Sequence, residues 1–238
     1  MMSAFPGGTS LSFLDVYGDE APDHVCGGSP HVHLASTECY IGVGGRGQLH
    51  TLTSEGVSAV DIEPGSLVWF TPGTIHRAVN LGELRVIVLM SNSGLPEAGD
   101  AVLTFPAEYL QDPERYEAAA ALASDGTEQE RAVAAARRRD LAVAGYLPIR
   151  DALAAGDTGP LEEFRAAAAA LVRARASEWA DIVRTGPAAQ ADETFSALQQ
   201  LAAGDASFLA DAAVAAAPDP TRRFGMCGRL LAYDLTSR

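Results

Sequence analysis

The sequence predicts an α+β protein in which an antiparallel β-barrel is followed by an α-helical C-terminal region. Residues 31–90 contain short strand-forming segments separated by Gly, Pro and Asn, a pattern typical of an antiparallel sandwich or barrel. After Phe105, alanine dominates and the strand signals stop, which favours helices. We therefore expect a barrel over residues 1–105, helices over 106–220 and a distinct tail over 221–238.

The expected strands lie between consecutive turn signals. Leu11–Tyr17 is rich in strand-forming residues, and the apolar run 86–90 indicates a strand that is covered on both faces. The candidates after residue 30 are His31–Leu34, Glu38–Val43, Gly47–Leu52, Ala59–Ile62, Ser66–Phe70, His76–Asn80 and Leu84–Met90. Strand-type residues return after Pro220, so we expect about Phe224–Leu235 to pack as a strand on the barrel.

Capping and breaking residues mark the expected helices. Pro113 opens the first helix, which extends to about Ala123, because proline in the first turn costs no hydrogen bond. Thr127 and Glu130 form a capping box for a second helix that stops near Gly145. Further helices are expected over Leu147–Ala155, Pro160–Arg184, Ala188–Ala203 and Ser207–Ala216.

Composition limits the partners of the chain. The 238 residues suffice for one large domain or two modest ones. The formal net charge of −14 repels nucleic acid phosphates and anionic membranes, so neither is expected as a partner. All 17 basic residues are arginine, which excludes a lysine Schiff-base mechanism. The run Arg137–Arg139 does not indicate nucleic acid binding, because consecutive residues spread around most of the circumference of a helix.

Cysteine usage and the N-terminal residues predict a cytoplasmic protein. Cys26, Cys39 and Cys227 are scattered, and the absence of a Cys-x-x-Cys pair argues against a zinc knuckle. An odd number of cysteines fits a reducing compartment. The first residues lack the basic and apolar regions of a secretory signal, and no run of 18 uncharged apolar residues occurs.

Three histidines and one glutamate are candidates for a metal site. His31 and His33 point to the same side if the backbone is extended, because side chains alternate across a strand. Glu38 has the wrong parity for one unbroken strand, so a turn or bulge is expected within Leu34–Thr37. His76 adds a third imidazole. Such a set suits a divalent transition metal such as Fe, Mn, Ni or Zn.

The spacing of these residues resembles the two conserved motifs of the cupin superfamily. The pattern His-x-His-x4-Glu-x6-Gly fits His31, His33, Glu38 and Gly45, and Gly-x2-His-x3-Asn fits Gly73, His76 and Asn80. The resemblance covers about residues 10–105. It implies a small jelly-roll barrel with one metal held by the two His, the Glu and the later His, and it implies a homodimer.

The sequence departs from the cupin pattern at two turn positions. Val25 stands where the first motif usually opens with Gly, although Gly27 and Gly28 are close by. Thr71 stands where the second motif usually has Pro, and the proline follows at Pro72. Both departures concern loop geometry and leave the ligand positions intact.

Two further residues are candidates for catalysis. Tyr40 shares the strand and the parity of Glu38, so it should face the barrel interior and could orient a substrate. His50 could project into the pocket as an acid or base, although an exposed or core position is equally compatible with the pattern. Trp69 is a further candidate for the barrel lining, and Asn80 is better explained as a side chain that ties a turn.

Three functions are compatible with these observations. The first is a metal-dependent enzyme acting on a small molecule, with dioxygenase chemistry favoured over isomerase or lyase chemistry. The second is a non-catalytic small-molecule-binding or sensory cupin. The third is a structural protein whose helical region binds a partner. Fold alone does not decide between them.

Overall fold

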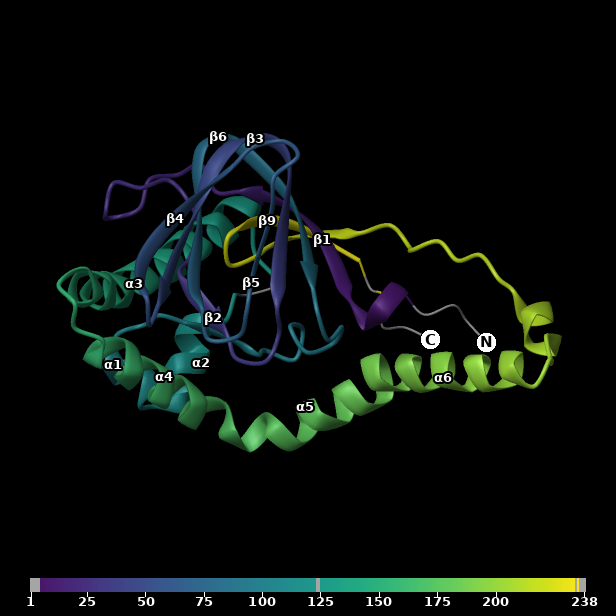
Figure 1. Cartoon of the computed structure of the whole chain (residues 1–238). Coiled ribbons are helices and arrows are strands. Elements are labelled where there is room, and N and C mark those ends of the chain that lie inside the picture. The colour runs from purple at the N-terminus through teal and green to yellow at the C-terminus, as the bar shows by residue number, and fades with distance from the viewer. Residues whose placement is uncertain (1–4, 123–124, 234, 236–238) are drawn as a thin grey trace.

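A single antiparallel β-sheet, curled into a barrel, organises the molecule (Figure 1). The computed structural model describes residues 5–122, 125–233 and 235. Its strands are β1 (Ser10–Val16), β2 (His31–His33), β3 (Glu38–Thr53), β4 (Gly56–Ile62), β5 (Leu67–Phe70), β6 (Ile75–Met90), β7 (Ala101–Leu103), β8 (Thr221–Phe224) and β9 (Gly228–Ala232). The main path is β4-β3-β6-β1-β9-β8, with β2 paired to β6 and β7, and β5 paired to β3.

Two long strands, β3 and β6, replace the four shorter strands expected for their residues. The turn signals at Gly44–Gly45 and Leu81–Glu83 do not separate strands. They coincide with register shifts in the β3–β6 ladder between Gly42 and Gly47, which are β-bulges. A bulge inserts an unpaired residue and so changes which side chains face inward.

The tail joins the barrel. β9 pairs antiparallel with β1, with Phe13 opposite Leu231 and Leu14 opposite Leu230. β8 pairs with β9 through the turn at 225–227, so the two strands form a hairpin at one end of the sheet. The strand-type residues after Pro220 predicted a strand here.

The helices follow β7 in the chain. They are α1 (Ala107–Leu110), α2 (Pro113–Ala120), α3 (Glu128–Ala154), α4 (Gly159–Val172), α5 (Ala176–Val183) and α6 (Ala189–Ala202). Short 3-10 turns lie at Pro6–Gly8, Arg173–Arg175 and Ser207–Asp211, and a π turn lies at Arg184–Ala188. The predicted capping box of Thr127 and Glu130 is present at the start of α3.

Two of the three buried hydrophobic clusters of the described chain account for most of the packing between these elements. The first fills the barrel and includes Tyr40, Phe70 and Val86. The second joins the outside of the barrel to the helices and includes Ile75 from β6, Tyr146 from α3 and Phe164 from α4. The helices up to α4 therefore share a core with the sheet, and the expected domain division at residue 106 stays a prediction.

α3 continues through the expected break at Gly145. A Cβ at this position would lie 2.2 Å from the carbonyl oxygen of Thr104 and 2.6 Å from the carbonyl carbon of Phe105. Glycine is thus needed for close approach of the helix to the segment after β7, and it does not end the helix. Pro148, inside α3, is also accommodated.

The later helices also differ from the prediction. The expected helix Pro160–Arg184 is interrupted by the 3-10 turn after α4. The break expected between Arg184 and Ala188, where Gly186 and Pro187 lie, is a π turn that leads into α6. Proline lacks the N–H of a regular helical bond, and a widened turn accommodates that loss. The expected last helix shrinks to a 3-10 turn, because a short alanine-rich segment without packing is unstable as a helix.

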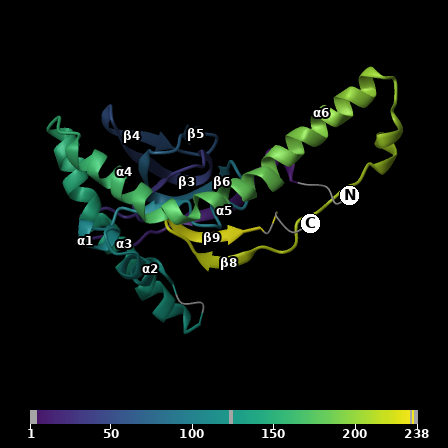
Figure 2. The same ribbon diagram turned by 90° about the horizontal axis from the view of Figure 1, so that it is seen from below.

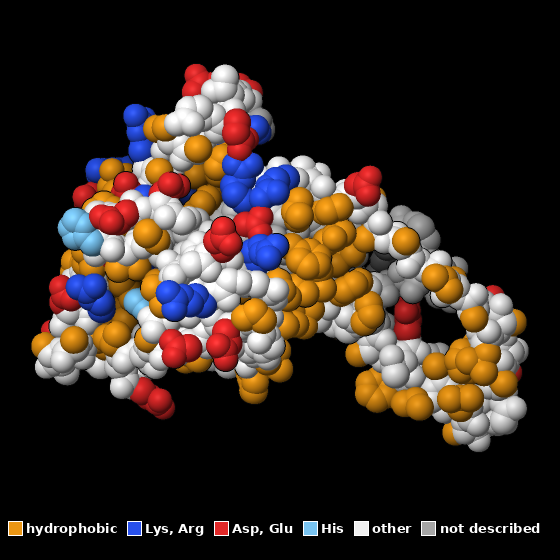
Figure 3. Space-filling model, turned by 90° about the horizontal axis from the view of Figure 1, so that it is seen from above, with side chains coloured by type: hydrophobic (Ala, Val, Ile, Leu, Met, Phe, Trp, Pro, Cys, Tyr) orange, Lys and Arg blue, Asp and Glu red, His pale blue; other side chains and the backbone are white. Residues whose placement is uncertain are grey.

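The arm, defined here as residues 176–220, extends away from the barrel and returns at β8 (Figures 1 and 2). Hydrophobic side chains gather on the part of the arm that projects from the body (Figure 3). The exposed ones include Phe195, Leu198, Leu201, Leu209 and Val214. The first predicted helix was expected to end at about Ala123, which lies outside the described residues.

Among the residues that the structure describes, no helix combines the length and the apolar character needed to cross a membrane.

Candidate metal centre

The four predicted ligands converge inside the barrel. β2 carries His31 and His33, β3 begins with Glu38, and His76 lies in β6 directly opposite His31. All four side chains are buried, and one potential ligand atom from each lies within 4.8 Å of the others. The expected turn is present as a bend at Leu34–Ala35, and it allows Glu38 to face the histidines.

Each imidazole is oriented by an oxygen behind it. His31 Nδ1 lies 2.9 Å from the carbonyl oxygen of Ser29, and His76 Nδ1 lies 3.2 Å from that of Thr74. His33 Nδ1 lies 2.8 Å from Asp100 Oδ1. Because these oxygens accept hydrogen bonds, each Nδ1 donates its proton and Nε2 is directed towards the centre.

Asp100 is a functional residue that sequence analysis did not find. It is fully buried and comes from the loop before β7, far from both motifs in the sequence. A carboxylate behind a ligand histidine fixes the ring and increases its basicity. The only sequence signal was an acidic residue directly before an apolar strand, which is too common to be useful.

Unpaired polar atoms show that the cluster fits a cation. Glu38 Oε2 lies 3.2 Å from His33 Nε2 and 3.1 Å from His76 Nε2. Yet Glu38 Oε2 and His76 Nε2 both lack a partner in hydrogen-bond geometry despite complete burial. Buried polar atoms are costly without a partner. A divalent transition metal would satisfy both, since three imidazole nitrogens and a carboxylate oxygen are suitable ligands.

The pKa values of the cluster follow from burial and from mutual interactions. Burial lowers the pKa of His31 well below its usual value, and His76 and His33 lower it further. Burial also opposes the charged form of His33, but the hydrogen bond with Asp100 and the nearby charge of Glu38 raise its pKa to about 9. Burial would raise the pKa of Glu38, but the histidines hold it well below the usual range. Without metal, His33 and Glu38 therefore form a charged pair.

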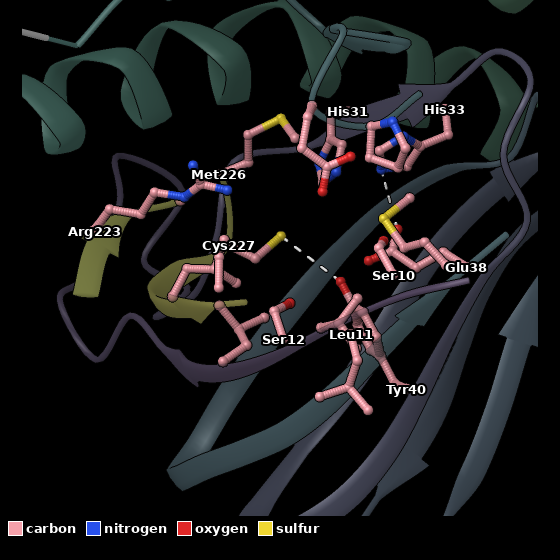
Figure 4. A pocket seen from close by; sticks show the side chains of 18 of the residues that line it. Ser10, Leu11, Ser12, His31, His33, Glu38, Tyr40, Arg223, Met226 and Cys227 are labelled. Carbon is pink, nitrogen blue, oxygen red and sulfur yellow. Dashed lines mark hydrogen bonds and ion pairs between the residues drawn. The ribbon is translucent and has the colours of Figure 1, made fainter. Parts of the chain in front are cut away.

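The cluster opens onto a cavity of about 400 Å³ (Figure 4). His31, His33 and Glu38 form part of its wall. The other side is formed by the β8–β9 hairpin, whose Met226 and Cys227 are seen beside the histidines in Figure 4. The tail thus completes the wall of the candidate site.

Tyr40 faces the cavity as predicted. Its hydroxyl donates a weak hydrogen bond to Cys227 Sγ at 3.9 Å. Burial raises the pKa of Tyr40 well above its usual value and that of Cys227 to about 11, so both keep their protons at neutral pH. Gly28 permits this arrangement, because a Cβ there would lie 2.4 Å from the Cα of Cys227.

His50 does not belong to the cavity wall. Its Nε2 lies 3.1 Å from Gln48 Oε1, and burial together with the nearby Arg77 lowers its pKa. The β-bulges between Gly42 and Gly47 reverse the inward face of β3, so the expected projection of His50 into the pocket is not observed. Whether His50 affects catalysis stays a prediction.

Two further expectations are resolved by the structure. Trp69 is not a lining residue, because 65% of its surface is exposed on the outer face of β5. Asn80 ties the bend in β6 as expected: its Oδ1 accepts hydrogen bonds from the backbone N–H groups of Gly82 and Leu84. The amide nitrogen of Asn80 donates to the carbonyl oxygen of Val16 at 2.8 Å.

Together, the antiparallel barrel and its buried His–His–Glu–His cluster form a cupin-type fold with a candidate metal site. No protein-family model matches the chain, and no curated protein matches it.

Solved structures that resemble parts of the chain include a cupin 2 conserved barrel protein from Salinispora arenicola. It is 17% identical, with a TM-score of 0.30, over 41% of this chain and 76% of that chain. The TDP-fucose-3,4-ketoisomerase WlaRA from Campylobacter jejuni is 10% identical, with a TM-score of 0.31, over 38% and 64%. An oxalate oxidase in complex with glycolate is 21% identical, with a TM-score of 0.26, over 36% and 51%. These likenesses are too partial to indicate an activity.

Proposed function

We propose that the chain is a metal-dependent enzyme acting on a small molecule. The observation that carries the proposal is that His31, His33 and Glu38 lie in the wall of a cavity large enough for a small ligand. A structural metal is usually closed off by protein ligands, whereas a catalytic one faces a space that substrate can enter. When bound, the metal would supply Lewis-acid or redox chemistry.

Within this class, we favour dioxygenase over isomerase or lyase chemistry. An isomerase or lyase that moves a proton needs a protein base whose pKa lies near the working pH. Tyr40 and Cys227 in the cavity wall stay protonated, and His50 lies outside it. Apart from the cluster itself, Glu97 is the carboxylate of the described cavity wall, and it is exposed. Oxygen-dependent chemistry can proceed at a redox-active metal without such a base.

Metal content is the first test of this proposal. The wild-type protein, purified without added metal or chelator, should contain about one divalent transition metal per chain. His76→Ala should contain much less, because it removes a ligand from the centre of the cluster. His24→Ala is the matched control, since His24 is exposed and lies outside the cluster. Equal metal in all three proteins would show that the cluster is not a metal site.

Oxygen uptake distinguishes the reaction classes. The Fe(II)-loaded protein should consume oxygen with at least one member of a panel of small carboxylates, phenols and sugars, and His76→Ala should not. An isomerase or lyase would instead exchange substrate C–H hydrogens with deuterated solvent in the absence of oxygen. Tight binding of a panel member without either reaction would indicate the non-catalytic binding function.

The arm favours a second function, which is partner binding. Its exposed Phe195, Leu198 and Leu201 recur at helical spacing, so they form an apolar stripe on α6. We propose a second copy of the chain as the partner, in keeping with the homodimer that the cupin resemblance implies. Light scattering should give a dimer mass for the wild type and a monomer mass after Phe195→Asp, and an unchanged monomer mass in both would contradict the proposal.

A further inference from the structure

The three consecutive arginines of α3 have three different environments. Arg137 is exposed to solvent. Arg139 is buried and is fully engaged, because its guanidinium bonds Asp140 and the carbonyl oxygens of Asp19 and Glu20. Arg138, between them, lines the same cavity as the metal cluster. Since α3 is not part of the barrel, the helical region contributes a cation to the candidate site.

Arg138 lacks a compensating negative charge. Its Nη1 donates to the carbonyl oxygen of Ala120 at 3.2 Å, and its Nη2 donates to that of Gly225 at 2.8 Å. Its Nε is buried and has no hydrogen-bond partner. None of the ion pairs among the described residues includes Arg138, and burial lowers its pKa. A largely buried guanidinium usually pairs with an anion, since desolvation of an unpaired charge is unfavourable.

The charges around the cavity favour an anion. Arg223 lies on β8 at the rim, and Figure 4 shows its guanidinium extending towards the cavity. The negative groups of the described wall are Glu38, which faces the histidines, and the exposed Glu97. A divalent cation would outweigh the single charge of Glu38. The cavity would then carry net positive charge at both its metal side and its Arg138 side.

We infer that the substrate of this site is a small carboxylate and that Arg138 recognises its charge. This inference rests on the proposed function, because the cavity is taken to be the substrate site. Guanidinium groups match the planar geometry of carboxylates. A molecule with oxygens at two positions could contact both the metal side and Arg138 within a space of about 400 Å³. Arg138 would be a specificity residue supplied from outside the barrel.

Calorimetric titration of the Mn(II)-loaded full chain tests the inference. The probes are malonate, its neutral analogue malonamide, and inorganic phosphate. Malonate should bind the wild type more tightly than malonamide or phosphate does. Arg138→Gln should weaken malonate binding by at least about tenfold, since it removes one partner of a charge pair, and should leave the metal content unchanged. Arg137→Gln, one residue away and exposed, should bind malonate like the wild type.

Arg138→Lys separates recognition of charge from positioning of the hairpin. Lysine keeps the charge but cannot keep both hydrogen bonds to Ala120 and Gly225. Partial retention of malonate binding supports charge recognition, whereas an equal loss in the Gln and Lys variants overturns it. The inference is also overturned if the wild type does not bind malonate, binds malonamide equally well or prefers phosphate. It is likewise overturned if Arg138→Gln has no effect on malonate binding. If the wild type takes up no metal, the proposed function fails separately, and the same titrations on metal-free protein still decide whether Arg138 binds the anion.

Discussion

The α4 helix and the α6 helix have similar alanine-rich sequences and the same length, yet only α4 is part of the folded core. α4 buries Leu161, Phe164 and Ala168 against the barrel and α3. α6 buries none of its residues, and 64% of the surface of Phe195 is exposed. Alanine favours a helix in both places, but stability comes from large side chains that have a surface to contact. The comparison separates helix formation from integration into the fold.

Among the tests of this comparison between packed and unpacked segments, removal of the β8–β9 hairpin should have the largest effect on stability. A chain that ends before Arg222 loses the strand pair with β1 and the contacts of Cys227 and Leu230 with the barrel core. We expect a loss of about 3–6 kcal/mol in the free energy of unfolding, because core side chains and a sheet edge become exposed. Denaturant unfolding measures it, with a chain ending after Tyr233 as the control. An unchanged midpoint would show that the hairpin does not stabilise the barrel.

A matched pair of phenylalanine substitutions tests the two helices directly. Phe164→Ala should cost about 3–5 kcal/mol, because Phe164 is only 4% exposed and its removal leaves a cavity. Phe195→Ala should change the stability of the monomer by no more than about 0.5 kcal/mol. Both are measured by urea unfolding at a protein concentration at which the chain is monomeric. Similar losses would show that α6 is packed as firmly as α4.

Asp100→Asn extends the comparison to metal binding, by changing a buried carboxylate of the barrel that has a partner. Asn keeps the shape of Asp100 but removes the charge that faces His33 Nδ1 at 2.8 Å. We expect metal affinity to fall by about 10- to 100-fold, which competition with a metallochromic chelator measures. Asp192→Asn, on α6, is the control and should have no effect. A wild-type affinity in Asp100→Asn would mean that the orienting carboxylate is dispensable.

The smallest expected effect is the release of protons when the metal binds. In metal-free folded protein the pKa of His33 is raised to about 9, above its usual value of about 6.5. The charged form of His33 therefore stabilises the folded state fully below about pH 6.5. This contribution is lost as the pH rises through about 9. At pH 7.5 metal must displace this proton, so binding should release about one proton per chain, and affinity should rise with pH up to about 9. Calorimetry in buffers of different ionisation enthalpy measures the release. Asp100→Asn should release less, and zero release by the wild type would contradict the raised pKa.

The sequence predicted the four ligands because their spacing matches the two cupin motifs, and for His31, His33 and Glu38 also because local strand geometry constrains their facing. The parity of His31 and His33, and the bend before Glu38, can be deduced without tertiary structure. The sequence left the position of His50 open between the pocket and an exposed or core site, because the bulges that reverse the facing of later β3 residues cannot be located from glycines alone. Gly145 was taken for a helix stop because a glycine that permits close backbone approach has the same sequence signature as one that ends a helix.

Asp100 and Arg138 could not be predicted from the sequence. Each reaches the site through a contact between segments distant in the chain: Asp100 with His33, and Arg138 with Gly225. Such contacts follow from the tertiary arrangement of the loop, α3 and the hairpin, and no spacing rule connects them. The sequence showed Arg138 only as one of three consecutive arginines spread around a helix, whereas the structure divides Arg137–Arg139 among solvent, the cavity and the protein interior.

The pairing of β1 with β9 also has a consequence for biosynthesis. Residues 10–16 leave the ribosome long before their partner residues 228–232 exist. During that interval β1 can pair only with β6, and its other edge stays open to neighbouring chains. Contacts between residues so far apart also slow folding, because a long loop must close first. The cavity wall, and with it any discrimination between ligands, therefore cannot be complete before residues 228–232 have left the ribosome.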